Sequence, residues 1–286
     1  MPYVTGRLRQ LGATLALLAL PFAASIAARA DDGFRGDYLA VGDSVAFGSN
    51  PLLDAHNAHN FIGYPTPVAE AFDLKLTDPA CPGETSSHFI SLTGADLICG
   101  TYRQSNPLHV AYATSQLDFA DAFLRSHDDT RLVTINIGSN DVFSLQAKCG
   151  GNTNCIEQGL PATLGVISAN LDTIYGHIRK LDRYRRRLVA LTYYSFDYSD
   201  GTTTTVIALL NKTIAERTVA WGGIVADGFE EFAAASALFN GDTCAAGLRI
   251  VVKASPLTCD IHPSPRGRAL LARAVLEALH KHEYDY

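Results

Sequence analysis

The feature that most constrains the fold is a regular alternation of short, apolar, β-rich runs with longer segments of helical period. Five such runs occur, at residues 37–41, 74–77, 131–137, 187–194 and 223–226. Strands that alternate with helices favour parallel pairing, because each parallel connection needs a long crossover. Runs without polar alternation are typical of strands that are buried on both faces. The sequence therefore predicts a mainly parallel, five-stranded α/β sheet with helices on both sides.

The clearest helix is expected at residues 155–181, where aliphatic residues return every three or four positions. The stripe consists of Ile156, Leu160, Leu164, Ile167, Leu171, Ile174, Ile178 and Leu181. Further helices are expected at 204–220 and 265–281, the last with Ser264 and Pro265 as cap and first-turn residues. Polar and glycine-rich stretches at 48–63, 79–107 and 149–154 indicate long loops.

Residues 1–30 have the layout of a secretory signal peptide. Arg7 and Arg9 form the basic end, an apolar stretch follows from Leu11, and the sequence Ala28-Arg29-Ala30 has the small residues of a cleavage site. An uncleaved membrane anchor is the alternative, because the apolar stretch is just long enough to span a bilayer. An anchor has no need of the small residues, so we expect cleavage after Ala30 and one large domain at 31–286.

The charge of the mature chain excludes one class of partner. Cleavage removes three arginines and no acid, which leaves 20 basic against 29 acidic side chains and a net charge of −9. Phosphate binding needs a basic field, so a nucleic-acid partner is not expected. No later stretch is long and apolar enough for a membrane anchor, and we expect a secreted monomer.

All six cysteines lie in the mature chain, an even number in a protein expected to leave the cytoplasm. Disulfides persist in such compartments. The simplest pairing joins neighbours in sequence: Cys81 with Cys99, Cys149 with Cys155, and Cys244 with Cys259. A zinc site is the alternative, and the lack of a Cys-x-x-Cys pair weighs against it.

Polar residues follow three of the predicted strands. Ser44 stands in Gly42-Asp43-Ser44, Gly83 follows the second strand in Cys81-Pro82-Gly83-Glu84, and Asn140 follows the third in Gly138-Ser139-Asn140-Asp141. The carboxyl ends of parallel strands are where open α/β sheets bind ligands. Each motif alone is more typical of an ordinary turn or helix cap.

A fourth motif lies just before the last predicted helix, where His262 is preceded by Asp260 and followed by Pro263. An imidazole close to a carboxylate is a suitable general base. The chain has nine histidines, so position alone would not single out this one.

Together the four motifs have the order and spacing of the SGNH (GDSL-like) hydrolase family, which the chain resembles from Tyr38 to about Leu279. The resemblance implies a three-layer α/β/α, flavodoxin-like fold and a secreted esterase or lipase. It further implies Ser44 as nucleophile, His262 as base, and an oxyanion hole formed by Gly83, Asn140 and the Ser44 backbone N–H. An imidazole that takes the proton makes a serine hydroxyl an effective nucleophile. The chemistry needs no cofactor and no metal.

One position departs from the family pattern. The family's triad acid lies three residues before the histidine, where this chain has Cys259, and Asp260 lies only two residues before it. The second ring nitrogen of His262 needs an acceptor to hold its tautomer. Asp260 and the main-chain carbonyl of Cys259 are both candidates, and we favour Asp260.

The remaining candidates have simpler interpretations. His56 and His59 are spaced as metal ligands could be, but a third ligand is not evident. Asp43 and Asp141 are expected to be structural, the arginines at 183 and 185–187 to form a solvated helix end, and three aromatic residues near Ser44 to line an acyl pocket or pack in the core. These aromatic residues are Phe47, Phe61 and Tyr64.

Two other functions remain open from the sequence. A carbohydrate acetylesterase would use the same residues in a more polar cleft. A non-catalytic binding protein could keep the same fold, although the complete Ser, Gly, Asn and His set favours an enzyme.

Overall fold

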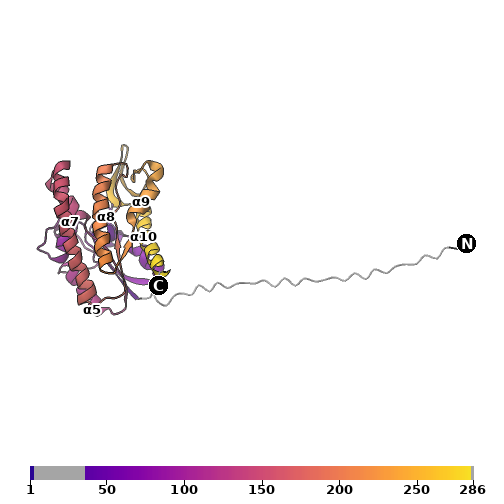
Figure 1. Cartoon of the computed structure of the whole chain (residues 1–286), viewed down its shortest axis with the longest axis horizontal. Coiled ribbons are helices and arrows are strands. Elements are labelled where there is room, and N and C mark those ends of the chain that lie inside the picture. The colour runs from indigo at the N-terminus through magenta and orange to yellow at the C-terminus, as the bar shows by residue number, and fades with distance from the viewer. Residues whose placement is uncertain (3–35, 285–286) are drawn as a thin grey trace. The chain divides into compact units, whose positions relative to one another are not determined.

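Five parallel strands form the central sheet of the computed structural model, which describes residues 1–2 and 36–284 (Figure 1). The strands are β1 (Gly36–Gly42), β2 (Leu74–Thr77), β3 (Thr130–Asn136), β4 (Arg187–Leu191) and β5 (Ile224–Ala226), in the order β2-β1-β3-β4-β5. Each prediction of a strand is confirmed. The predicted signal peptide at 1–30 lies outside the described residues apart from its first two positions.

The sheet is buried on both faces, as its uninterrupted apolar runs predict. In the middle of β1, the consecutive residues Leu39, Ala40 and Val41 are all fully buried, although successive side chains point to opposite faces. The same holds for Leu132 and Val133 on β3. Both faces of the sheet are therefore covered by packed side chains.

The helices alternate with the strands along the chain. They are α1 (Ser44–Phe47), α2 (Pro65–Phe72), α3 (Ser86–Ile90), α4 (Cys99–Ser105), α5 (Gln116–Ser126), α6 (Ser139–Lys148), α7 (Thr153–Gly176), α8 (Gly201–Ala220), α9 (Gly228–Ser236) and α10 (Pro265–Tyr284), with single turns η1 (Ala58–Asn60), η2 (His177–Leu181) and η3 (Ala237–Phe239). Among the described helices, none combines the length and apolar character that a membrane crossing requires.

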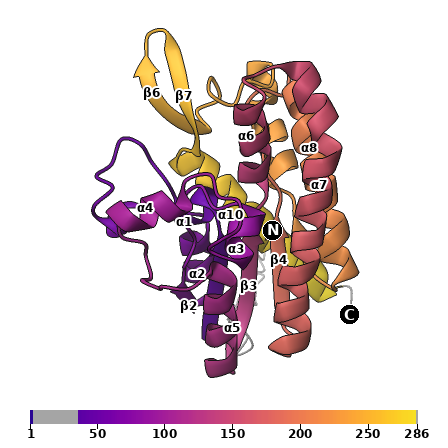
Figure 2. The ribbon, with the colours of Figure 1, turned by 90° about the vertical axis from the view of Figure 1, so that its left-hand side faces the viewer.

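Two layers of helices enclose the sheet. Helix α7 packs on α8, as Figure 2 shows, and α5 contacts the turn η2 that continues α7. On the other side, α10 packs on α2 and contacts β4 and β5. This division follows from right-handed crossovers. The connections β2 to β3, β3 to β4 and β4 to β5 all cross the sheet in the same direction, so their helices lie on the same face. The arrangement is the predicted three-layer α/β/α fold.

Helix α7 buries the second half of its predicted aliphatic stripe. Ile167, Leu171 and Ile174 are fully buried, whereas Ile156 and Leu164 near its start are only partly covered. Leu160 is the buried member of the first half, at 5% exposed, so burial is continuous only toward the end of the helix. Truncating Leu171 to alanine would cost about 2 to 5 kcal/mol, the usual range for a core leucine.

Two parts of the fold differ from what the sequence predicts. The expected loop at 79–107 contains the short helices α3 and α4. The segment before α10 forms an antiparallel hairpin of β6 (Arg249–Ala254) and β7 (Leu257–Pro263), which projects from the body (Figure 2). His262 therefore lies on a strand and not in a loop.

Three disulfides join the cysteines that are neighbours in sequence. The Cα–Cα distance is 5.7 Å for Cys81–Cys99, 5.6 Å for Cys149–Cys155 and 5.7 Å for Cys244–Cys259. These distances lie in the ordinary range for disulfides. The first bridge encloses Gly83, and the third joins β7 to the segment that follows η3.

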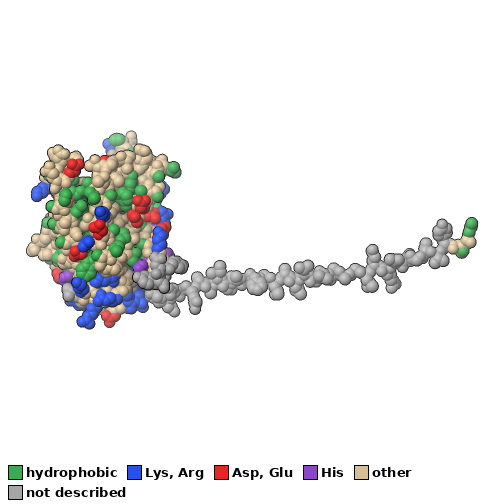
Figure 3. Space-filling model, in the orientation of Figure 1, with side chains coloured by type: hydrophobic (Ala, Val, Ile, Leu, Met, Phe, Trp, Pro, Cys, Tyr) green, Lys and Arg blue, Asp and Glu red, His purple; other side chains and the backbone are tan. Residues whose placement is uncertain are grey.

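Basic side chains gather at one end of the folded body (Figure 3). A pocket at the amino ends of β3, β4 and β5 is lined there by Arg131, Arg179, Arg185, Arg186 and Arg187. Arg185 and Arg186 are exposed, as expected for the solvated end of a helix. Because the strands are parallel, this pocket lies at the edge of the sheet opposite Ser44.

Candidate active site

Ser44 directly follows Asp43 at the carboxyl end of β1 and is the first residue of the one-turn helix α1. Gly42 makes this turn possible, since its φ is +149° and an added Cβ would lie 2.3 Å from the carbonyl oxygen of Asn136. The Oδ1 atom of Asp43 caps the helix by accepting a hydrogen bond from the N–H of Val45 at 2.9 Å. Ser44 is 8% exposed. Its side chain is thus held on a tight turn at the edge of the sheet.

The carboxylate of Asp43 connects the ends of three strands. Its Oδ2 atom accepts hydrogen bonds from Tyr193 Oη at 2.6 Å and from Ser139 Oγ at 3.0 Å. Burial raises the pKa of Asp43 to about 6, even though the hydrogen bonds from Tyr193, Val45 and Ser139 oppose the shift. The structural role expected for Asp43 fits these contacts, which fix the turn before Ser44 against the residues that follow β3 and β4.

Gly83 and Asn140 lie beside this turn. Gly83 has a φ of +78°, a conformation that side chains rarely adopt. The Nδ2 atom of Asn140 donates a hydrogen bond to the main-chain oxygen of Glu84 at 2.9 Å, and its contact with Asp43 Oδ2 is longer, at 3.4 Å. The amide of Asn140 is therefore oriented by one good bond, and its second N–H has only a weak partner.

Asp141 binds the segment after Gly83. Its two carboxylate oxygens lie 2.6 Å from Ser86 Oγ and 2.8 Å from the Ser86 N–H. Burial raises the pKa of Asp141. These bonds join the start of α6 to the start of α3, which agrees with the structural role expected for this residue.

His262 and Asp260 face each other on β7. The distance between His262 Nδ1 and Asp260 Oδ1 is 2.5 Å, and the same oxygen accepts from the His262 backbone N–H at 3.0 Å. Between Cys259 and Pro263, β7 has two more residues than the facing part of β6, so the strand bulges here. The Asp260 side chain folds back to the N–H two residues on, as in an Asx turn, which explains how a spacing of two brings the carboxylate and the ring together. Burial tends to raise the pKa of Asp260, but the hydrogen bond and charge of His262 outweigh it and lower that pKa below its usual value. Of the two acceptors considered from the sequence, the carboxylate is the one in contact.

The segment that carries His262 is fixed from two sides. The Cys244–Cys259 disulfide anchors β7 three residues before the histidine. The hydroxyl of Tyr194, which follows β4, donates to the main-chain oxygen of Ile261 at 2.6 Å. The imidazole is therefore held by contacts from a part of the chain far away in sequence.

One pocket of about 430 Å³ brings Ser44, Gly83, Asn140 and His262 together. Its other lining residues are mostly apolar. They come from the loop after α1, from α4 and the segment before it, from α6 and from β7. They are Ser49, Asn50, Pro51, Leu53, Ala55, Phe61, Pro82, Leu97, Ile98, Tyr102, Phe143 and Ile261. Of the three aromatic residues named from the sequence, Phe61 is the one in this lining, and Phe47 packs behind it with the ring centroids 5.1 Å apart.

A second, much smaller pocket of about 30 Å³ also borders Ser44 and His262. Its other lining residues include Phe143, Phe196 and Ile207. Phe143 and Ile261 also belong to both linings, so the two spaces are neighbours. Ser44 and His262 are therefore bordered by one large pocket and one small pocket.

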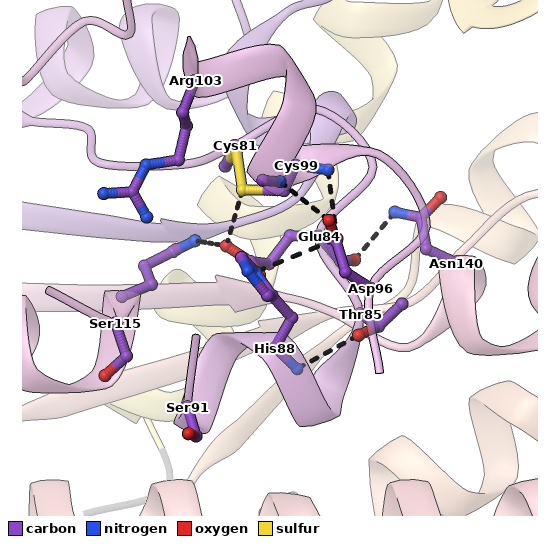
Figure 4. Close-up of polar contacts among 12 residues, drawn as sticks. Cys81, Glu84, Thr85, His88, Ser91, Asp96, Cys99, Arg103, Ser115 and Asn140 are labelled. Carbon is purple, nitrogen blue, oxygen red and sulfur yellow. Dashed lines mark hydrogen bonds and ion pairs between the residues drawn. A yellow bond between two sulfur atoms is a disulfide. The ribbon is translucent and has the colours of Figure 1, made fainter. Parts of the chain in front are cut away.

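Sequence reasoning missed a polar cluster around Glu84, the residue after Gly83 (Figure 4). His88 Nδ1 lies 2.5 Å from Glu84 Oε1, and Asp96 accepts hydrogen bonds from the N–H groups of Cys99 and Gly100. Glu84, His88 and Asp96 lie close enough together to share a metal ion. Their polar atoms, however, already bond to one another and to the backbone, so we assign no metal here. The spacing of Glu84 and His88, four apart, is the only sequence signal of the pair.

Comparisons with known proteins bear on the family and the fold of this chain. The model of the GDSL-like Lipase/Acylhydrolase family matches residues 40–270. No curated protein sequence matches the chain significantly.

Several solved structures share the fold. An extracellular lipase from Streptomyces rimosus is 19% identical with a TM-score of 0.56, and a phospholipase A1 from Streptomyces albidoflavus is 20% identical with a TM-score of 0.54; both matches cover 85% of this chain and 99% of the other. A catalytic mutant of an acetylxylan esterase from Geobacillus stearothermophilus is 13% identical with a TM-score of 0.53, covering 85% of this chain and 94% of that one. At these identities the matches establish the fold alone.

Proposed function

The chain belongs to the GDSL-like lipase/acylhydrolase family, and on that premise we propose that it is a secreted serine esterase or lipase that forms an acyl-enzyme on Ser44. The observation that carries the proposal is the common pocket of Ser44, Gly83, Asn140 and His262. Four segments from distant parts of the sequence contribute one residue each to it. An ester carbonyl bound there would meet a hydroxyl, an imidazole and amide donors at once.

The first step is attack by Ser44 Oγ on the ester carbonyl carbon. His262 accepts the hydroxyl proton as general base and then gives it to the departing alcohol, which leaves an acyl-enzyme. In the second step water attacks the acyl carbon while His262 accepts its proton. His262 then gives this proton to Ser44 Oγ as the bond to the acyl group breaks and the acid is released. Asp260 orients the imidazole and stabilises its charged form.

Negative charge develops on the carbonyl oxygen in both steps. We assign its stabilisation to the backbone N–H groups of Ser44 and Gly83 and to the Asn140 side chain. The bond from Asn140 to the Glu84 oxygen supports this role, because it orients the amide before substrate binds. A single donor of this kind contributes roughly 10²- to 10³-fold in rate.

The larger pocket favours an ester with a sizeable apolar group. Its volume of about 430 Å³ and its lining by Leu53, Phe61, Ile98 and Phe143 suit an acyl chain better than a sugar. Apolar walls stabilise such a chain in proportion to the area that leaves water. We therefore propose medium-chain or longer esters as the preferred substrates.

A carbohydrate acetylesterase is the second candidate, and the small pocket favours it. A space of about 30 Å³ beside Ser44 and His262 has room for an acetyl group and little more. In that arrangement the larger pocket would hold the alcohol half of the substrate. A comparison of medium-chain glycerides with acetylated xylan separates the two candidates.

Secretion is part of the proposal and rests on two observations. Residues 1–30 have the layout of a signal peptide, and three disulfides indicate an oxidising compartment. Expression with the native leader tests this directly. We expect the mature protein outside the cytoplasm, beginning at Asp31, and an intact leader on the purified protein would contradict cleavage.

The function is tested with purified mature protein and p-nitrophenyl esters of graded chain length. We expect turnover that is abolished in both Ser44→Ala and His262→Ala, with folding checked by circular dichroism. Ser126→Ala is a suitable control, since Ser126 is exposed at the end of α5 and lies outside the pocket. Turnover that persists in Ser44→Ala would overturn the assignment, and a folded wild type without turnover would favour a non-catalytic binding protein.

A further inference from the structure

The side chain of Gln116 completes the hydrogen bonding of Gly42 at the end of β1. Strand β2 pairs with β1 only as far as Leu39, and beyond it the Gly42 oxygen accepts one backbone bond, from the Cys81 N–H at 3.1 Å. The Oε1 atom of Gln116 accepts from the Gly42 N–H at 2.6 Å, and its Nε2 atom donates to the Gly42 oxygen at 3.0 Å. Gln116 is 1% exposed and lies at the start of α5. One amide therefore holds both backbone groups of the residue that precedes Asp43 and Ser44.

The same amide reaches the turn that contains Gly83. The Nε2 atom of Gln116 also lies 3.0 Å from Glu84 Oε2, and Glu84 is 1% exposed. The other carboxylate oxygen of Glu84 is bound by His88 Nδ1 at 2.5 Å (Figure 4). The main-chain oxygen of Glu84 in turn accepts the hydrogen bond from Asn140. A continuous set of hydrogen bonds thus runs from Gly42 through Gln116 and Glu84 to Asn140.

This use of a carboxylate is not the most stable way to fill buried space. Taking a carboxylate out of water costs several kcal/mol even after relaxation, and apolar replacements of a buried ion pair are often neutral or stabilising. Burial accordingly raises the pKa of Glu84, against the opposing effect of the His88 hydrogen bond. The Glu84–His88 pair instead contributes orientation, because each hydrogen bond fixes the geometry of the group that it reaches.

We propose that Gln116 and Glu84 are positioning residues, which hold the end of β1 at a fixed separation from the Gly83–Glu84 turn. Ser44 follows the first of these segments, and Gly83 and Asn140 belong to or depend on the second. The inference rests on the proposed function, in which a carbonyl group must fit between Ser44 and the donors of the oxyanion hole. Neither Gln116 nor Glu84 lines the pocket, so both act through other residues.

The first test replaces Gln116 by leucine, which is similar in size and has no hydrogen-bonding group. We expect kcat for a p-nitrophenyl ester to fall about 10- to 100-fold, because small displacements of reacting groups have effects of this order. KM should change by less than about threefold, since the pocket walls stay in place. If the leucine variant does not fold, Gln116→Asn takes its place, because its amide is one methylene too short to reach both partners.

The second test uses Glu84 and includes a conservative rescue. Glu84→Leu should lose kcat as Gln116→Leu does. Glu84→Gln should keep kcat within about threefold of wild type, since a glutamine can accept from Gln116 and donate to the other tautomer of His88. If Glu84→Gln loses as much as Glu84→Leu, the hydrogen-bond directions are not what matters and the proposal is wrong.

A matched control comes from the same helix. Asp121 on α5 binds His177 Nδ1 at 2.8 Å, a carboxylate–imidazole pair like that of Glu84 and His88. It lies away from the pocket. Asp121→Leu, matched to Glu84→Leu, should lower the melting temperature and leave kcat within about twofold, because loss of a buried hydrogen bond affects stability in general. An equal loss of kcat in this variant would reduce the role of Gln116 to general stability.

A double-mutant cycle separates positioning from structure more sharply. If Gln116 acts through the oxyanion hole, Gln116→Leu should cost much less kcat in an Asn140→Ala background than in wild type. Equal costs in both backgrounds would contradict the proposal. The outcomes are distinct from those of the proposed function: an active, Ser44-dependent wild type with an equally active, folded Gln116→Leu refutes this inference alone.

Discussion

The carboxylate of Asp260 binds His262 twice, through the ring Nδ1 at 2.5 Å and through the backbone N–H at 3.0 Å. Both bonds go to one oxygen, Oδ1, so the carboxylate fixes the ring and the strand that carries it together. The spacing of two residues is sufficient because β7 bulges between Cys259 and Pro263 and the Asp260 side chain folds back on the chain there. This local turn therefore does here what a three-residue spacing does in the family pattern.

This contact predicts the effect of Asp260→Asn. The variant keeps the shape of the side chain but cannot stabilise the charged imidazole, so we expect kcat for a p-nitrophenyl ester to fall roughly tenfold or more. KM should stay close to that of the wild type. Steady-state kinetics at pH 8 measure both constants. A variant with unchanged kcat would show that Asp260 has no part in the reaction.

The Cys244–Cys259 disulfide should affect activity as well as stability. Replacing both cysteines by alanine opens a loop of 15 residues, for which chain entropy gives a loss of about 3 kcal/mol. Because the bridge anchors β7, kcat should also fall in the folded variant. Urea unfolding and ester kinetics measure the two effects.

The Cys149–Cys155 bridge is the matched control. It closes a loop of 6 residues, worth about 2 kcal/mol by the same relation, and neither cysteine lines the pocket. Its double alanine variant should lose stability and keep its kcat. Equal loss of kcat for both bridges would mean that the disulfides act only on global stability.

The pocket predicts a change of chain-length preference in Leu53→Trp. Leu53 lines the larger pocket, and an indole there would occupy space that an acyl chain needs. We expect kcat/KM for an octanoate ester to fall about tenfold, the scale of one or two methylene contacts, with little change for the acetate. Leu92→Trp is the control, since Leu92 is exposed and outside the pocket. If Leu53→Trp has equal effects on both esters, the acyl chain does not lie there.

Asp78 predicts how stability depends on pH. Burial raises the pKa of Asp78 to about 8, and its bond from the Ala80 N–H opposes the shift only in part. In the unfolded chain the same carboxyl titrates near its ordinary value of about 3.9. The folded state therefore binds the proton more tightly, and this contribution to stability is complete below pH 4 and is lost as the pH rises through 8.

Asp78→Asn removes that titration. The free energy of unfolding of the variant relative to wild type should rise steadily between pH 5 and 8 and level off above pH 8. Each pKa unit corresponds to about 1.4 kcal/mol, so even one unit is measurable by urea unfolding. Parallel stability curves for the two proteins across this range would contradict the assignment.

The sequence was sufficient for the sheet because its strands are buried on both faces. A run such as Leu132 to Ile137 has few other stable environments in a chain of this size, and its order along the chain fixes the crossovers. The strand ends then bring Ser44, Gly83 and Asn140 to one edge without any knowledge of side-chain contacts. The apolar pattern of the sequence therefore predicts the strands correctly where both of their faces are buried.

The hairpin of β6 and β7 could not be predicted in this way. Val251, Val252 and Leu257 are all partly exposed, so apolar and polar residues do not alternate as they do in a half-buried strand. Helices α3 and α4 are short, and caps such as Thr85, which accepts from the His88 N–H, stabilise them more than any apolar stripe does.

The contacts of Gln116 were also beyond sequence reasoning. It lies 74 residues from Gly42 and 32 from Glu84, and a glutamine in the first turn of a helix has no distinguishing pattern. The choice between Asp260 and the Cys259 carbonyl stayed open for a related reason, since it depends on whether the segment is extended or turned.

The central claim is that the Ser44 hydroxyl is activated by His262. It is tested most directly by treating the purified mature protein with a fluorophosphonate and mapping the modified peptide by mass spectrometry. The account predicts one adduct per chain, on Ser44, with labelling slowed by orders of magnitude in His262→Ala. Labelling at another residue, or labelling of Ser44 at the same rate in His262→Ala, would contradict it.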